Sequence, residues 1–160
     1  MVNQIDDITP LSGMTNLEYL YLGGNQVSDL TPLSGLTSLR EAHLGANQIS
    51  NLTPLSGLVN LHELTLGGNQ ITDISPLSSL TDLWYLELQN NQISNLTPLG
   101  VMGGLGELGL NDNQISDLTP LYGLTNLHWL YLWNNPQITL TKINALKAEI
   151  PNCGIWHNAV

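Results

Sequence analysis

A 22-residue step governs this sequence. Seven asparagines are separated by that step, namely Asn3, Asn25, Asn47, Asn69, Asn91, Asn113 and Asn135. Six prolines keep the same step in a second ladder, namely Pro10, Pro32, Pro54, Pro76, Pro98 and Pro120. Because two ladders in register do not arise by chance, the chain is predicted to be a repeat array, in which one structural unit stacks on itself.

Each unit contains the pattern L-x-x-L-x-L-x-x-N-Q-[IV], as in residues 17–27. Below, the first leucine of this pattern is place one and the asparagine is place nine. The alternation predicts a short strand in which places four and six point inward and places three, five and seven point outward. Parallel strands are expected to start near the place-one leucines, which are Leu17, Leu39, Leu61, Leu83, Leu105 and Leu127.

The rest of each unit carries the pattern [ST]-[DN]-[LI]-[TS]-P-L, as in residues 28–33. Thr31 before Pro32 is typical of an N-cap followed by the first helical position, where a missing N–H costs nothing. The few residues left for the return favour a short 3₁₀ turn over a long α-helix. The place-nine asparagine is expected to point inward and to satisfy backbone groups at the bend, which links neighbouring units.

The period breaks near the C-terminus. Residues 140–149 are predicted to form an α-helix, and the apolar residues expected on one face are Ile143, Leu146 and Ile150. The residues that follow repeat the start of the unit pattern, so a seventh, terminal strand is expected there. Cys153 and Trp156 are predicted to occupy leucine positions of that strand, with Cys153 a buried core thiol rather than a reactive one.

The pattern over residues 3–138, with phrases such as NQISDLTPLYGLTNL, resembles the leucine-rich repeat family, specifically the 22-residue type of the internalins, which are bacterial surface proteins. The resemblance implies an α/β fold: a curved right-handed leucine-rich repeat solenoid, with a parallel β-sheet on the concave side, 3₁₀ turns on the convex side and a short C-terminal α-helical cap. One domain over residues 1–160 is expected, with repeats at 3–138 and the cap at 139–160. Family members bind partner proteins through the concave face. The helical N-terminal cap and the immunoglobulin-like domain of internalins have no counterpart here, so host-cell invasion is not implied.

The charge balance excludes some partners. Three basic residues face 13 acidic ones, which gives a net charge of −10. Nucleic acids and anionic membranes attract clustered Lys and Arg, so neither is an expected partner. No window approaches the ~18 apolar residues of a membrane span, and the first residues lack a signal-peptide pattern, so the chain as given is expected to be soluble without membrane insertion. Its location stays open, at the cell surface or secreted if an export signal was removed.

The outward strand places are the candidate binding surface, because packing fixes the inward ones. Aromatic side chains mixed with carboxylates on an exposed sheet are typical of protein-binding hot spots. The predicted partner-binding residues are Tyr19, Tyr21, Glu41, His43, Glu63, Tyr85, Glu87, Glu107, Trp129, Tyr131 and Trp133.

Two subsites are expected on this surface. One is an aromatic shelf with a shallow floor beside it at Gly106 and Gly109, and its members are Trp129, Tyr131 and Trp133. The other is acidic, because Glu41 and Glu63 lie at the same place on neighbouring strands, where a partner's Lys or Arg would relieve their repulsion. Packing of the aromatics on the C-terminal cap, and relief of the acids by solvent and His43, are the open alternatives.

Three function classes follow. A protein-recognition module is the leading one, beside a carbohydrate binder that uses the aromatic shelf and a ligand-free repeat scaffold, natural or engineered. An enzyme is not expected, because an open sheet lacks the desolvated cleft that a glycosidase acid needs. No cofactor or metal site is expected either, because the histidines are scattered over different units; they are His43, His62, His128 and His157.

The first unit has no predecessor in the sequence as given. One face of its aliphatic side chains is therefore expected to lack a coil to pack on, and its strand to have an unpaired edge. The side chains concerned are Ile5, Ile8, Leu11, Leu17 and Leu20. A homodimer or another specific contact through this unit is the leading expectation, and loss of a native cap or simple fraying are the alternatives.

Overall fold

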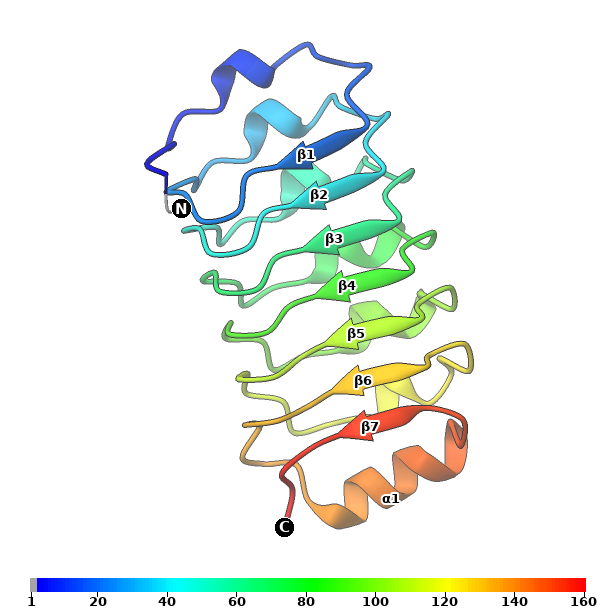
Figure 1. Ribbon diagram of the computed structural model, residues 1–160. Helices are drawn as coiled ribbons and strands as arrows, with labels where there is room; N and C mark the ends of the chain where they lie inside the picture. Colours follow the sequence, from blue (N-terminus) through cyan, green and yellow to red (C-terminus); the bar gives the residue numbers. More distant parts are fainter. Residues whose placement is uncertain (1–2) are drawn as a thin grey trace.

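The computed structural model describes residues 3–160, which form a right-handed solenoid of stacked coils (Figure 1). In this part of the chain seven strands pair in parallel, in chain order, as one sheet. They are β1 (Tyr19–Tyr21), β2 (Glu41–His43), β3 (Glu63–Thr65), β4 (Tyr85–Glu87), β5 (Glu107–Gly109), β6 (Trp129–Tyr131) and β7 (Gly154–Trp156). The predicted leucine-rich repeat solenoid is thereby confirmed, with the sheet on its concave side.

The 22-residue period sets the strand register. From β1 to β6 every residue pairs with the residue 22 positions later, as Tyr19 does with Glu41. Each strand starts two residues after the predicted leucine, because that leucine still belongs to the preceding turn; the Leu39 N–H donates to the Leu36 carbonyl at 3.0 Å. The inward leucines are buried along the whole stack and form one continuous core.

The asparagine ladder ties each coil to its neighbour. The Asn47 side-chain Nδ2 donates to the carbonyl oxygens of Leu22 at 2.9 Å and Leu44 at 3.0 Å, while its Oδ1 accepts the Val27 N–H at 3.0 Å. The same three kinds of bond recur at the buried Asn69, Asn91, Asn113 and Asn135. The predicted structural role is confirmed for these residues, whereas Asn3 is exposed and stands outside the buried ladder.

Short 3₁₀ helices form the convex side of the described residues. They are η1 (Thr9–Leu11), η2 (Thr31–Leu33), η3 (Thr53–Leu55), η4 (Ser75–Ser79), η5 (Thr97–Val101) and η6 (Thr119–Leu121). The prediction that Thr31 is an N-cap is wrong, because Thr31 is the first residue of η2 and its own N–H needs a partner. Asp29 Oδ1 accepts that N–H at 2.8 Å. The capping group therefore lies two residues before the threonine.

The C-terminal helix closes the stack at one end (Figure 1). It is α1 (Leu140–Glu149), which begins after Thr139, and the Thr139 Oγ1 accepts the Lys142 N–H at 3.4 Å. The apolar residues predicted on its inner face are all buried, namely Ile143, Leu146 and Ile150. No helix within residues 3–160 is long and apolar enough to cross a bilayer.

The terminal strand exists, but one of its predicted positions is wrong. Cys153 is buried in a leucine position as expected. Trp156 is not, because β7 pairs Gly154 with Trp129 and Trp156 with Tyr131. β7 begins one residue after Cys153, whereas each earlier strand begins two residues after its place-one leucine. The register of β7 is therefore shifted by one residue, and Trp156 points outward.

The first coil is better covered than the sequence predicted. Ile8 and Leu20 are buried, with exposed fractions of 4% and 7%. Residues 3–8 run beside the first coil and bond to it, because the Gln26 N–H donates to the Ile5 carbonyl at 2.9 Å. Ile5 itself remains exposed, and two further leucines, Leu11 and Leu17, are partly buried. Among the described strands β1 pairs with β2 alone, so one edge stays open.

Candidate functional site

The candidate site is the outer surface of the sheet, which we call the strand face. In Figure 1 the 3₁₀ helices lie behind the sheet and α1 lies at its end, so no helix of residues 3–160 covers this face. Of the predicted partner-binding residues, those exposed on it are Tyr19, Tyr21, Trp129 and Trp133. The others are half-buried, namely Glu41, His43, Glu63, Tyr85, Glu87, Glu107 and Tyr131. Their outward placement follows from strand alternation, and their role in binding remains a prediction.

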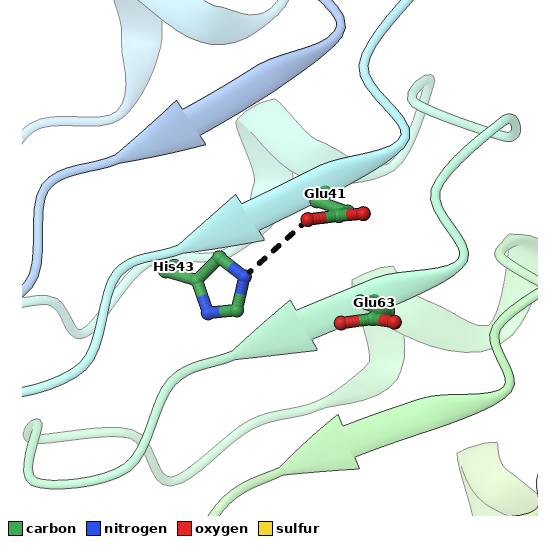
Figure 2. Close-up of side chains that lie close together, drawn as sticks. All are labelled: Glu41, His43 and Glu63. Carbon is green, nitrogen blue, oxygen red and sulfur yellow. Dashed lines mark ion pairs between the residues drawn. The ribbon is translucent and has the colours of Figure 1, made fainter.

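Four side chains of β1, β2 and β3 form one connected group, the β1–β3 cluster: Tyr21, Glu41, His43 and Glu63. The Tyr21 and His43 rings stack with centroids 4.6 Å apart and planes 7° apart. Tyr21 Oη donates to Glu41 Oε2 at 2.8 Å, and this bond is the main reason that the pKa of Tyr21 is raised above its usual value. His43 Nε2 lies 3.8 Å from Glu41 Oε2. Figure 2 shows Glu63 beside Glu41 and His43, on the next strand.

The middle of the strand face is a shallow polar hollow. It is lined by Glu87, Gln89, Glu107, Gly109, Asn111 and Tyr131. Tyr85 Oη donates to Glu87 Oε1 at 2.6 Å, and burial together with this bond raises the pKa of Tyr85. Burial and the nearby charge of Glu107 raise the pKa of Tyr131 as well. The predicted floor at Gly109 is therefore present, although it is bordered by carboxylates and amides rather than by the aromatic shelf alone.

The aromatic shelf is larger than predicted, because Trp156 of β7 joins it. The Trp156 ring lies 4.9 Å from the Trp129 ring and is stacked on Tyr131 at 5.1 Å, measured between centroids. Gly154 makes this arrangement fit, since a Cβ there would come within 2.8 Å of the Trp129 ring. Trp129 and Tyr131 thus pack partly on the terminal strand, as the alternative interpretation proposed, yet Trp129 remains 47% exposed.

Sequence reasoning missed Trp84, which is 52% exposed beside the strand face. It stands at place two, just before β4, and its ring lies 6.1 Å from that of Tyr85. The expectation of a bare floor at Gly106 is wrong, because a Cβ at Gly106 would come closer than any real contact to Trp84 Nε1. Trp84 therefore covers this glycine. The run of polar side chains at place two, Glu18, Arg40 and His62, was the signal that this place faces solvent.

Two groups of side chains within residues 3–160 could carry chemistry, a carboxylate–histidine cluster and a cysteine thiol. One set of three side chains could hold a metal ion, because the donor atoms of Glu41, His43 and Glu63 all lie within 4.8 Å of one another. Cys153 is buried, and burial raises the pKa of its thiol to about 11. A thiol that stays protonated at neutral pH is a poor nucleophile, so the core interpretation of Cys153 holds.

The chain matches a known repeat family. The family described as Leucine Rich repeats (2 copies) matches residues 2–35, 37–79 and 59–100, which is more than half of the chain. No curated protein matches the chain at a significant level.

Solved structures give closer likenesses. An internalin C2 from Listeria monocytogenes is 41% identical with a TM-score of 0.91, and the match covers 98% of this chain and 68% of that one. An internalin (inlF) from the same organism is 34% identical with a TM-score of 0.92, covering 98% of this chain and 47% of that one. A leucine-rich repeat protein from Leptospira interrogans is 30% identical with a TM-score of 0.87, covering 96% and 40%. This chain thus spans about two thirds of the first structure and less than half of the other two.

Proposed function

Since this chain belongs to the leucine-rich repeat family, in its internalin-like type, we propose that it binds a partner protein through the strand face. The fold is typical of protein-interaction modules, and the frame that carries the face is fixed by core packing. We take residues 1–160 to act as one binding domain. Recognition rather than catalysis is proposed, because the described strands form an open sheet rather than the deep cleft in which a glycosidase acid acts.

The observation that carries the proposal is the set of large aromatics that are about half exposed on the strand face or, for Trp84, beside it. Their exposed fractions are 51% for Tyr19, 65% for Tyr21, 52% for Trp84, 47% for Trp129 and 49% for Trp133. A soluble surface gains nothing by exposing so much aromatic area, whereas Trp and Tyr dominate the energetics of protein interfaces. The Tyr21, Trp84 and Trp129 rings already pack on neighbouring rings, so less side-chain entropy is lost when a partner covers them.

The carboxylates indicate the charge of the partner surface. Glu41 and Glu63 are direct register partners, and Glu87 and Glu107 border the central hollow. Among the described residues no Lys or Arg pairs with any of these four. A partner with Lys or Arg at matching positions would neutralise them and associate faster at low salt.

The test begins with the biotinylated chain on an array of purified extracellular proteins, followed by biolayer interferometry on each hit. Trp129→Ala and Trp133→Ala are expected to weaken binding by roughly 30-fold or more, the loss typical of an aromatic hot spot. Val101→Ala is the matched control, because Val101 is 62% exposed on η5 of the convex side. A hit that is lost in Val101→Ala and kept in both tryptophan variants would contradict the proposal.

The aromatic shelf favours carbohydrate as the second candidate. Flat sugar faces stack on exposed tryptophan, and Trp129 and Trp156 are neighbouring, partly exposed rings of this shelf. A glycan array run with the same biotinylated chain distinguishes the two classes. Glycan hits that are abolished by Trp129→Ala, together with an empty protein array, would move the function to carbohydrate binding.

A further inference from the structure

We propose that Glu41, His43 and Glu63 form a binding site for a divalent transition-metal ion, with Zn²⁺ as the expected ion. The sequence predicted no metal site, because its histidines are scattered over different units. The proposed site instead combines one histidine and one glutamate of β2 with a glutamate of β3. It does not depend on the proposed protein binding, because all three ligands come from this chain.

The donor atoms converge without rearrangement of the backbone. Glu41 and Glu63 are opposite each other in the β2–β3 register, and His43 lies two residues after Glu41 on the same face of β2. Figure 2 shows the three side chains grouped on this side of the sheet. Their donor atoms lie within 4.8 Å of one another, and the Glu41 Oε2 to His43 Nε2 distance is 3.8 Å.

These separations suit a zinc ion. Zinc bonds of about 2.0–2.2 Å in tetrahedral geometry place neighbouring ligand atoms about 3.4 Å apart. The Glu41 Oε2 to His43 Nε2 separation of 3.8 Å is already close to that value, and no separation among the three donor atoms is greater than 4.8 Å. Rotation of a half-exposed glutamate side chain covers this difference, so the ion can be held by small side-chain movements alone.

The imidazole is oriented so that one nitrogen is left for a metal. Its other nitrogen, Nδ1, lies 3.4 Å from the Thr65 Oγ1, which can accept the Nδ1 proton. The stacked Tyr21 ring fixes the plane of the imidazole, and the Tyr21 hydroxyl holds one oxygen of Glu41. Outer partners of this kind, which set the histidine tautomer and steady the carboxylate, are what metal-binding histidines and carboxylates usually have.

Charge supplies an independent reason for a cation at this position. Two carboxylates placed directly opposite each other on adjacent strands destabilise the sheet. The nearest long basic side chain, Arg40, points to Glu18, with Nε 3.3 Å from Oε2. The other basic side chains lie far along the chain on α1, at Lys142 and Lys147. Tyr21 and His43 contact Glu41, but no Lys or Arg of the described residues pairs with Glu41 or Glu63, so a bound divalent cation would offset the remaining repulsion.

The donor types select the class of metal. Mg²⁺ and Ca²⁺ prefer six or more oxygen ligands, whereas two carboxylates and one imidazole suit Zn²⁺ and its neighbours in the transition series. Three protein ligands on an open face leave the fourth position to water, or to a ligand from outside the chain.

Isothermal titration of the chain with ZnCl₂ tests the site. One ion per chain is expected, and His43→Gln and Glu63→Gln are each expected to weaken binding at least tenfold. His62→Gln and Glu149→Gln are the matched controls, because each removes the same kind of side chain outside the cluster; both are expected to bind within twofold of the parent chain. Titration with MgCl₂ or CaCl₂ is expected to show no saturable binding at the same concentrations.

Two further readouts keep the test sound if a variant folds poorly. Far-ultraviolet circular dichroism without metal checks that each variant keeps the parent fold, and the parent's Tm is expected to rise on zinc addition while that of His43→Gln stays constant. Substitution with Co²⁺ is expected to give the intense visible absorption of a four-coordinate ion. Absence of saturable zinc binding, or equal binding by the parent chain and a folded His43→Gln variant, would overturn the proposal.

Discussion

The residue at place eight has a left-handed backbone in all six coils that contain it. The residues are Gly24, Ala46, Gly68, Asn90, Asp112 and Asn134, with φ between 55° and 71°. Glycine adopts this region freely, and asparagine and aspartate tolerate it, because their short polar side chains bond locally. Ala46, at φ 55°, gains neither advantage, so this coil has a small strain that its neighbours avoid.

Ala46→Gly is therefore expected to stabilise the protein by about 1 kcal/mol, since relief of the left-handed strain exceeds the entropy cost of glycine. The converse change, Gly68→Ala, is expected to destabilise it by about the same amount. No clash contributes to the second value, because a Cβ at Gly68 would meet only ordinary contacts, the nearest being 3.5 Å from Ala46. Urea denaturation measures both changes, and effects of the same sign would show that the coil is not strained at this place.

Cys153 provides a residue-scale prediction about pH. Burial raises the pKa of its thiol from an ordinary 9.0 to about 11 in the folded protein. Because the unfolded thiol ionises first, the unfolded state is favoured as pH rises, so stability is expected to fall between about pH 9 and pH 11. Comparison of parent and Cys153→Ala melting curves across this interval isolates the effect, which the variant should lack. Rapid modification of the native thiol by Ellman's reagent at pH 8 would contradict the buried assignment.

At the scale of the element, each 3₁₀ turn depends on an oxygen two residues before its first threonine or serine. Asp117 Oδ1 accepts the Thr119 N–H at 2.9 Å, and Asn51 Oδ1 makes the equivalent bond to Thr53 at 3.0 Å. The first of these bonds, with the Thr119 hydroxyl bond after it, lowers the pKa of Asp117. The repeat thus accepts either Asp or Asn here because the shared feature is an oxygen acceptor, not a charge.

Asp117→Asn is expected to leave stability at pH 7 nearly unchanged, whereas Asp117→Ala should lose about 1 kcal/mol, the usual value of a capping bond. The pH dependence separates the variants further. Because the folded pKa is lowered, the parent has its full stability above the unfolded pKa, near 3.8, and loses this contribution as pH falls through the lower folded value. Urea midpoints at pH 7 and pH 3 should show a larger loss in the parent than in Asp117→Asn, because Asp29 and Asp73, whose pKa values are lowered in the same way, titrate in both proteins. Equal losses in both would place the acid sensitivity elsewhere.

Most elements that could be predicted from the sequence are those in which the same contacts recur in every coil. Strand register and the buried asparagines follow from the 22-residue spacing, because every coil meets the same neighbours, and α1 follows from the helical spacing of its own apolar residues. Prediction failed where a position is set by a local contact. Trp156 was misplaced because one residue fewer leads into β7. The Thr31 cap was wrong because η2 already begins at Thr31, whose own N–H is accepted by Asp29. Trp84 was missed because its side chain reaches over a glycine of the next coil, which no alternation pattern encodes.

The candidate site was predictable in outline only. Alternation placed the outward residues correctly, since a strand leaves them no other side. What joins them depends on side-chain conformation: the stacked Tyr21 and His43 rings and the bond from Tyr21 to Glu41 cannot be read from spacing. The proposed metal site depends on this conformation, which is why the scattered histidines of the sequence suggested no metal.

At the scale of the whole molecule, net charge and exposed apolar surface have opposite effects on self-association. The chain carries a net charge of −10, so two copies repel each other at low ionic strength. The first coil nevertheless exposes Ile5 at 41% and Met14 at 49%, and β1 keeps an open edge among the described strands. Apolar burial is hardly affected by salt, whereas the repulsion is screened once the Debye length falls to about 8 Å at 0.15 M.

The 160-residue chain is therefore expected to self-associate weakly through its first coil, and more strongly as salt is added. Burial of Ile8 and Leu20 makes the available apolar area smaller than the sequence suggested, so a dimer should form only at high protein concentration. Sedimentation velocity over a wide concentration range at low and moderate salt measures this. Met14→Lys should abolish association by adding a charge to the contact, whereas Val101→Lys on the convex side, an equally large charge change, should leave it intact. Both variants lower the net negative charge by the same amount, so a difference in association between them can arise only from where the contact lies. A monomer under all conditions would show that the exposed first coil is tolerated in water.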